Sequence, residues 1–222
     1  MITTTIHSSS LAKSLDEFSA TRARTLAMVD GLAQEQLNFI PGPNRWSIGE
    51  VLDHILRAER LNRDQVAQLI QLKREGQKPE LRLTFSDLNV SVAGLPRSLL
   101  PLFETPLTLM NMFVPDCLRN YLTRTRIVPF RNPDPATPHA GRMGADLCGD
   151  LIASLLETKK LFQNNLDLDY DEMFVQHPLL GRYDVPGLLR FMSAHEQRHQ
   201  SQIAGIQSLA AKANGRIEAQ MV

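Results

Sequence analysis

Four long segments of the chain carry apolar residues at alternating spacings of three and four, which is the repeat of an amphipathic α-helix. They run from about residue 10 to 36, 48 to 75, 144 to 166 and 185 to 214. No segment shows a convincing alternation of apolar and polar residues, the mark of a half-buried strand. Four amphipathic helices can bury their apolar stripes against one another. The sequence therefore predicts an all-α fold, a four-helix bundle.

The ends of two of these helices carry start and stop signals. Ser47 and Glu50 form an S-x-x-E capping box before the second segment, and Gly76 follows its end. Pro186 suits the first turn of the fourth segment, and Asn214-Gly215 predicts a left-handed stop at its end.

A proline-rich stretch, residues 77–143, separates the second helix from the third. Its apolar part, residues 95–122, is expected to form one or two short helices, and the remainder is expected to be extended or turn-like. We expect residues 1–222 to form a single domain in which 77–143 is a long insertion.

Charge and composition narrow the classes of function. The chain has 24 basic and 24 acidic residues, so its net charge is zero, and no block of like charge argues for nucleic acid as a partner. No stretch approaches the ~20 apolar residues that cross a bilayer, and the first ten residues do not resemble a secretory signal. Cys117 and Cys148 are far apart, as expected for reduced, packed thiols. These features predict a cytoplasmic protein without membrane association.

Two histidines lie four residues apart in the fourth helix. His195 and His199 differ by about 40° around the helix axis, and both fall in the apolar stripe between Met192 and Ile203. Buried imidazoles need a partner for each ring nitrogen, and one metal ion can serve both. His54 lies in the stripe of the second helix and is the third candidate ligand. The other histidines, in expected loops or the N-terminal tail, are His7, His139 and His177.

Three neutral imidazoles leave at least one coordination position open to water or a thiol, which is what a catalytic metal requires. Hydrogen-bonded core histidines without a metal are the alternative. Three inward-facing histidines on two helices favour the metal. They do not identify it, because zinc, nickel, copper and iron all accept imidazole.

A second alternative comes from the same residues. His195, Glu196 and His199 also fit H-E-x-x-H, in which the glutamate is the general base of a metallopeptidase and Glu218 would be the third ligand. We rank this alternative lower. Glu218 stands four residues from the end of the sequence, and no upstream strand is expected to bind a peptide substrate.

Two sequence signatures are typical of one family. Residues 45–55, RWSIGEVLDHI, resemble the second-helix signature of the DinB/YfiT-like superfamily, and so do HPLLG at 177–181 and FMSAHEQRHQSQI at 191–203. The resemblance covers about two thirds of the chain and departs at the insertion. It implies a four-helix bundle with a three-histidine site that usually holds nickel or zinc. On this sequence the ligands fall on His54, His195 and His199.

Characterised members of that superfamily include thiol-dependent S-transferases and isomerases that use bacillithiol, mycothiol or glutathione, and dimers are common. We therefore expect a metal-dependent transferase, active on a small molecule, that activates a low-molecular-weight thiol or water. A non-catalytic metal-binding or stress-related protein is the alternative. A homodimer is expected.

Other side chains are candidates for supporting roles. Glu50 caps its helix or supports His54, and Gln202 stands one turn beyond His199, where it can orient that ring. Glu196 and Arg22 are weak catalytic candidates. Arg22 interrupts the apolar stripe of the first helix, where it either extends to the surface or reaches an anionic substrate.

Overall fold

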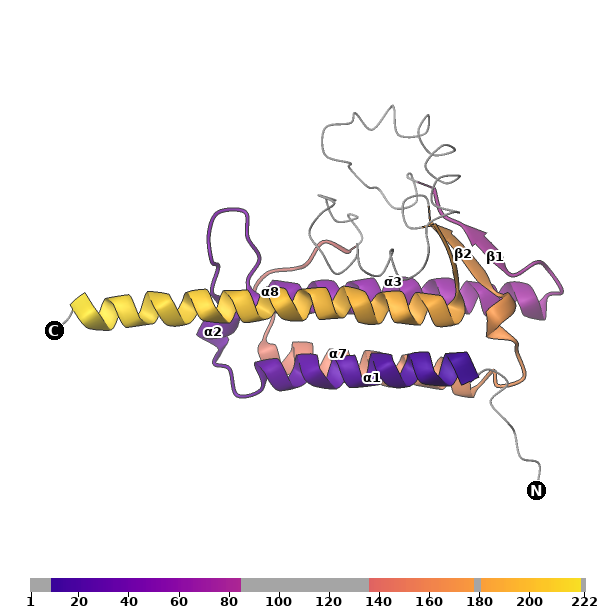
Figure 1. Ribbon diagram of the computed structural model, residues 1–222, viewed down its shortest axis with the longest axis horizontal. Coiled ribbons are helices and arrows are strands. Elements are labelled where there is room, and N and C mark those ends of the chain that lie inside the picture. The colour runs from indigo at the N-terminus through magenta and orange to yellow at the C-terminus, as the bar shows by residue number, and fades with distance from the viewer. Residues whose placement is uncertain (1–8, 85–135, 178–180, 221–222) are drawn as a thin grey trace, which may run out of the picture.

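Four long helices form the frame of the molecule. The structure is a computed structural model that describes residues 9–84, 136–177 and 181–220, with side chains as far as residue 213. The helices are α1 (Ser9–Val29), α3 (Ile48–Arg74), α7 (Gly144–Gln163) and α8 (Val185–Gln220). Figure 1 shows them in two layers, with α3 beside α8 and α1 beside α7. The predicted four-helix, mainly α fold is therefore confirmed.

The predicted bounds agree best where the capping signals are strongest. Ser47 caps α3: its hydroxyl accepts a hydrogen bond from the backbone N–H of Glu50, and the Glu50 carboxylate accepts one from the backbone N–H of Ser47. The helix ends at Arg74, and Gly76 has the left-handed φ of 72° that stops a helix. The sequence therefore predicts α3 to within one residue.

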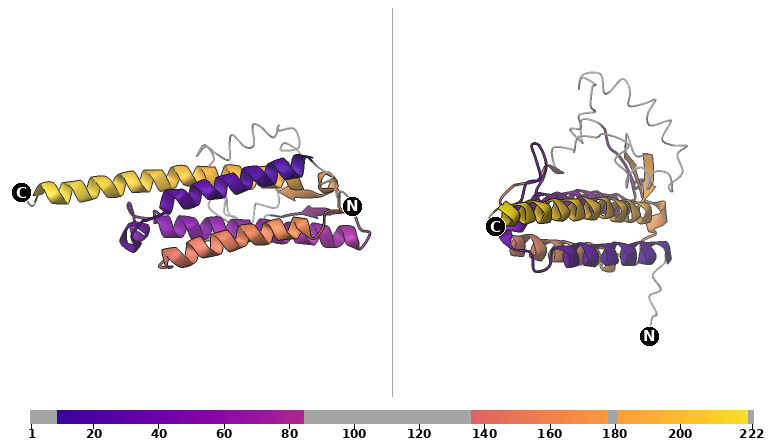
Figure 2. Two further views of the ribbon diagram at one scale, coloured as in Figure 1. Left: turned by 90° about the horizontal axis from the view of Figure 1, so that it is seen from below. Right: turned by 60° about the vertical axis from the view of Figure 1, so that its left-hand side comes forward.

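Three other bounds differ from the prediction. Helix α1 ends at Val29 because Gly31 takes a φ of 71°, and residues up to 38 form a separate short helix, α2 (Gln34–Asn38). Helix α7 ends at Gln163, three residues early. Helix α8 does not stop at Asn214-Gly215 but continues to Gln220. There it runs beyond the other described helices (Figure 2), and one glycine inside a helix costs only about 1 kcal/mol, which is too little to end it.

A small sheet lies at the opposite end of the bundle, which the sequence did not predict. It contains β1 (Glu80–Arg82), β2 (Phe174–His177) and β3 (Gly181–Asp184) in that spatial order. Strand β2 pairs with β1 in parallel and with β3 antiparallel. A short 3-10 helix, Tyr170–Glu172, precedes β2. Strands of three or four residues are too short for an alternating pattern, so the prediction of no strands was wrong.

The bundle interior has two apolar halves with a polar layer between them. One half, near the sheet, contains Phe18, Leu69 and Leu189, and the other contains Leu52, Leu151 and Ile203. Each long helix contributes polar side chains between the halves; the polar layer is Arg22, Thr25, Glu59, Ser154, Thr158 and Glu196.

Most of the insertion, residues 85–135, lies outside the described residues, and so do the helices expected within 95–122 and Cys117. In the part of the chain that the structure covers, no helix combines the length and apolar character needed to cross a membrane.

Candidate metal centre

The three predicted histidines come together between α3 and α8. His54 extends from the second turn of α3, where the capping box fixes the start of the helix. His195 and His199 extend from α8, one turn apart. The Nε2 atom of His195 lies 3.3 Å from Nε2 of His54 and 3.2 Å from Nε2 of His199. The ligand atoms of all three rings lie within 4.8 Å of one another. We call these side chains the histidine cluster.

Protein partners determine which ring nitrogen carries hydrogen in two of these histidines. Nδ1 of His54 lies 2.6 Å from the carbonyl oxygen of Ala136, which can only accept, so Nδ1 donates and Nε2 keeps its lone pair. Nδ1 of His199 likewise donates to the side-chain oxygen of Gln202, at 3.0 Å. Both Nε2 lone pairs are therefore directed into the cluster, and Gln202 makes the orienting contact that its spacing predicts.

Burial keeps the imidazoles of His54 and His195 neutral. His54 and His199 are 2% and 1% exposed. Desolvation lowers the pKa of His54 to about 4, although the hydrogen bond to Ala136 opposes the shift. Desolvation, reinforced by the two other histidines, also holds the pKa of His195 well below its ordinary value. The neutral imidazole is the form that binds a metal ion, so the donor set fits a transition metal.

Aromatic rings border the cluster on two sides. The Trp46 ring centroid is 4.9 Å from that of His54, and Phe191 stacks on His195 at 6.2 Å. Trp46 also packs against the apolar half that contains Leu52. Trp46 therefore contacts both this apolar half and the histidine cluster.

Glu196 and Arg22, the weak catalytic candidates, face away from the histidines. Glu196 is 1% exposed and accepts hydrogen bonds from Nε and Nη2 of Arg22, at 2.9 and 3.0 Å, and from the Thr25 hydroxyl at 2.6 Å. Arg22 is itself 1% exposed, so the expectation that it extends to the surface was wrong. Its side chain is held by partners inside the bundle.

Glu59 completes this buried group. Nη2 of Arg22 lies 2.9 Å from Oε2 of Glu59, an ion pair without good hydrogen-bond geometry, and the Thr158 hydroxyl donates to Oε1 of Glu59. A third donor of Arg22, Nη1, reaches the carbonyl of Leu151 at 2.7 Å. Two carboxylates and one guanidinium thus join α1, α3, α7 and α8 beside the histidine cluster.

Glu50 lies in the capping box. Its carboxylate accepts from the backbone N–H and hydroxyl of Ser47, at 2.8 and 2.9 Å, and within the described residues it makes no hydrogen bond to His54. Capping is therefore the role that the geometry supports.

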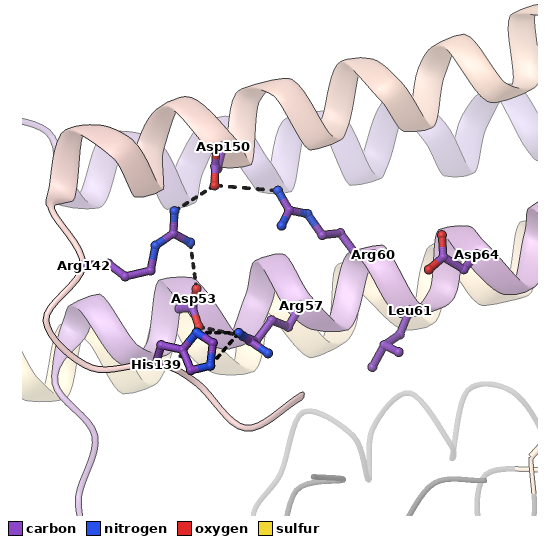
Figure 3. A pocket seen from close by; sticks show the side chains of 8 residues that line it. All are labelled: Asp53, Arg57, Arg60, Leu61, Asp64, His139, Arg142 and Asp150. Atoms are coloured by element: carbon purple, nitrogen blue, oxygen red, sulfur yellow. Dashed lines mark hydrogen bonds and ion pairs between the residues drawn. The ribbon is translucent and has the colours of Figure 1, made fainter. Parts of the chain in front are cut away.

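Charged side chains around a cavity hold the end of the insertion against α3 (Figure 3). Asp53 accepts hydrogen bonds, each at 2.8 Å, from Arg57, Arg142 and the backbone N–H of His139. Burial opposes its ionisation, but these donors outweigh burial and lower the pKa of Asp53.

The cavity, of about 420 Å³, is lined by Asp53, Arg57, Arg60, Leu61, Asp64, His139, Arg142 and Asp150. Arg142 also pairs with Asp150. These pairs fix the segment whose first described residue, Ala136, orients His54.

Arg198 is a residue of the site that sequence reasoning missed. Its Nη2 donates to Nε2 of His199 at 2.9 Å, so its guanidinium lies at the cluster. This Nε2 has one lone pair, so a bound metal ion would replace Arg198 as its partner. Arg198 lies in one of the two variable positions of H-E-x-x-H, and only its length lets it reach the next residue's ring. No spacing rule could have indicated that contact.

Comparison with known proteins agrees with this geometry. The family model described as the DinB superfamily matches residues 17–203, which include all three histidines. The chain belongs to the DinB superfamily. Searches of curated proteins and of solved structures found no match. The family is thus known, while no individual relative assigns an activity.

In this DinB protein the metallopeptidase alternative does not fit the fold. Glu218 lies on the same continuous helix as His199, nineteen residues further on, or about 28 Å along the axis. Two positions that far apart on one helix cannot both bind the same metal ion. Glu196, which would be the general base, is paired with Arg22.

Proposed function

We propose that this DinB protein binds one divalent transition-metal ion, zinc or nickel, through Nε2 of His54, His195 and His199. The observation that carries the proposal is the convergence of their ligand atoms within 4.8 Å. The hydrogen bonds to Ala136 and Gln202 support it, because they leave two lone pairs directed at the same point. Three imidazoles suit both metals.

We propose further that the site serves a transferase. An ion held by the three histidines would lower the pKa of a thiol or water so that it ionises near neutral pH. The sulfur of a low-molecular-weight thiol then forms a bond to carbon of a small electrophile, the bond to the leaving group breaks, and the thiol proton passes to solvent. Ala136 and Gln202 keep the ligand rings oriented, while Trp46 and Phe191 exclude water from two sides. Water in place of the thiol would give hydrolysis.

The alternative is a non-catalytic site, which would have a fourth protein ligand and no open position. In the described part of the chain the cluster contains three ligand side chains and no fourth. This composition favours an open position and therefore chemistry.

The proposal also covers the class of substrate, the location in the cell and the oligomeric state. A net charge of zero supports a small-molecule substrate over nucleic acid, and we place the protein in the cytoplasm. We also propose a homodimer. Ile152 and Leu156, one turn apart on α7, are 48% and 59% exposed, which supports a further contact on that helix.

Elemental analysis of the purified protein tests the metal site. We expect about one zinc or nickel ion per chain, and almost none in His54→Ala. His139→Ala is the matched control, because His139 is exposed and lies outside the cluster, and it should keep the metal. Circular dichroism verifies that each variant is folded. Equal metal content in His54→Ala and the wild type would overturn the assignment.

The transferase proposal is tested on the same preparations by following the loss of thiol in the presence of an electrophile. Metal-loaded protein should accelerate the reaction, whereas chelator-treated protein should not. Full activity without metal would end this part of the proposal.

A further inference from the structure

The acceptor for Nδ1 of His54 lies outside the four long helices. It is the carbonyl oxygen of Ala136, 82 residues further along the chain, in the segment that follows the insertion. A carbonyl inside a helix already accepts a hydrogen bond from its own helix, so an acceptor of this kind comes from a segment between helices. Residues 137–143 form neither helix nor strand. The position of the Ala136 carbonyl therefore depends on the side-chain contacts of residues 136–142, which we call the return segment.

Asp53 makes the main contacts with the return segment. Its Oδ1 accepts a hydrogen bond from Arg142 and its Oδ2 accepts one from the backbone N–H of His139, both at 2.8 Å (Figure 3). Asp53 is 1% exposed, and hydrogen bonds to an ionised group are about twice as strong as neutral ones. The return segment is thus fixed at two residues that closely follow Ala136.

Asp53 and His54 are consecutive on α3, but they do not face the same way. Successive side chains on a helix differ by about 100° around its axis, and Asp53 is not part of the histidine cluster. Both side chains nevertheless contact the return segment, His54 at its first residue and Asp53 further on. Release of the segment from Asp53 would leave Ala136 without a fixed position against Nδ1.

The Nδ1 acceptor determines whether His54 is ready to bind a metal ion. A neutral imidazole carries its single hydrogen on one of its two nitrogens, and the Ala136 carbonyl keeps that hydrogen on Nδ1. Without the acceptor, part of the population carries the hydrogen on Nε2, where no lone pair then remains for a metal ion. Loss of such a partner typically weakens metal binding by about 10- to 100-fold.

We propose that Asp53 is a positioning residue of the metal site: by holding His139 and Arg142, it places the Ala136 carbonyl against His54. The affinity for the metal ion then depends on how the end of the insertion is attached to α3. This inference rests on the metal binding of the proposed function and does not depend on the transferase activity.

Zinc affinity of the full-length protein, measured by competition with a chelator, is the first test. Asp53→Asn keeps the size of the side chain but removes the charge that binds Arg142. Its dissociation constant for zinc should rise by about 10- to 100-fold. Circular dichroism verifies that each variant is folded.

Arg142→Gln separates positioning from simple electrostatics, and it remains a test if Asp53→Asn does not fold. Loss of a positive charge would by itself tighten the binding of a cation. Loss of the attachment should instead weaken zinc binding, by at least about threefold. Arg60→Gln is the matched control, because Arg60 lines the same cavity but pairs with Asp150, and it should keep the wild-type affinity within about twofold. Zinc binding by Arg142→Gln as tight as that of the wild type, or tighter, would overturn the proposal.

The ring hydrogen of His54 gives a second readout, which a general loss of stability would not change. NMR spectra that correlate ring nitrogens with carbon-bound ring protons report which nitrogen carries the hydrogen, and His54→Ala identifies the signals by their absence. In the metal-free wild type the hydrogen should be on Nδ1. In Asp53→Asn and Arg142→Gln the two nitrogen shifts should move towards each other, as the second tautomer becomes populated. Weaker zinc binding with unchanged shifts would indicate a structural role alone and would contradict the proposal.

Failure of the proposed function has a different signature. If the wild type binds no zinc, the metal site is wrong, while the spectra of the metal-free protein still test the positioning of His54. A hydrogen that leaves Nδ1 in Arg142→Gln would support the role of Asp53 and its partners. A hydrogen that stays on Nδ1 in both variants would exclude that role.

Discussion

In His54 and in His199, one ring nitrogen donates to a protein acceptor and the other is directed into the histidine cluster. Ala136 and Gln202 accept from Nδ1, which leaves Nε2 directed into the cluster. In water an imidazole protonates near pH 6.5, but inside this cluster a proton would place an extra charge beside Arg198 with little solvent. Burial thus holds the pKa of His54 and of His195 below its ordinary value, so these two rings stay neutral in mild acid.

A consequence is that the metal-free protein loses stability in mild acid. The folded pKa of His54 is about 4, below the ordinary 6.5, so between these pH values the unfolded chain binds more protons. Stability from this group is complete above about pH 6.5 and falls as the pH decreases towards 4. His195 contributes in the same direction. We expect the free energy of unfolding to fall by roughly 1.4 to 2.8 kcal/mol per pH unit in this window.

Denaturant unfolding in excess chelator at several pH values between 4 and 7.5 measures this slope. His54→Gln should reduce it, since one of the titrating groups is removed. A free energy that stays level from pH 7 to 5 would contradict the assignment of neutral, buried imidazoles.

At single positions the sequence was informative where spacing alone brings side chains together. His195 and His199 share a helix face, and His54 lies on the stripe of another helix, so their meeting could be predicted. The same reasoning gave a wrong position for Arg22. An arginine between apolar residues of a helix suggests a side chain that extends to the surface, unless its buried partners are known. Glu59 and Glu196 come from two other helices, and only the packed bundle reveals that they meet Arg22.

The helices of the bundle are held in register by their polar layer as well as by apolar packing. Arg22 of α1 contacts Glu196 of α8, Glu59 of α3 and the Leu151 carbonyl of α7. Because Glu196 directly follows His195, this contact also sets the rotation of α8 that turns His195 towards α3. At this level one side of α8, with Glu196, contacts Arg22, and another side, with His195, faces the histidine cluster.

Removal of the single cation from this layer should be costly. In Arg22→Met two buried carboxylates lose their partner, and we expect a loss of about 3–5 kcal/mol in the free energy of unfolding. Arg24→Met is the control: Arg24 is exposed on the same helix, and its replacement should change stability by less than about 0.5 kcal/mol. Denaturant titration at pH 7.5 measures both.

A triple variant distinguishes an uncompensated charge from lost packing. Replacing Arg22 by Met and both Glu59 and Glu196 by Leu removes the charges together, and should recover most of the loss. A triple variant less stable than Arg22→Met alone would show that the charge argument is wrong.

Elements with their own boundary signals could be predicted, and elements that depend on distant partners could not. Ser47 and Gly76 define α3 by local hydrogen bonding and backbone conformation. Strand β1 exists because Glu80 pairs opposite Phe174, far along the chain, and no local pattern encodes that pairing. The early end of α1 follows from Gly31, one glycine in an otherwise continuous helical pattern.

At the scale of the whole molecule, helix α7 leaves part of its apolar surface uncovered. Ile152 and Leu156 are on the outer side of α7, while Leu147 and Leu151 of the same helix are buried. We expect analytical ultracentrifugation to give twice the chain mass of 24.9 kDa for the wild type. The double substitution Ile152→Lys and Leu156→Lys should give a monomer. Leu209→Lys, at an exposed position of α8, is the control, and a monomeric wild type would refute the dimer.

The chain leaves the bundle for its insertion, and returns from it, at two fixed points (Figure 1). Strand β1 is paired with β2 on one side, and the segment from Ala136 to Arg142 is held on α3 on the other. Between fixed ends the entropy of closing a loop grows only with the logarithm of its length, by about 0.6 kcal/mol for each doubling. Evolution can therefore lengthen, shorten or exchange the sequence between these anchors at little thermodynamic cost.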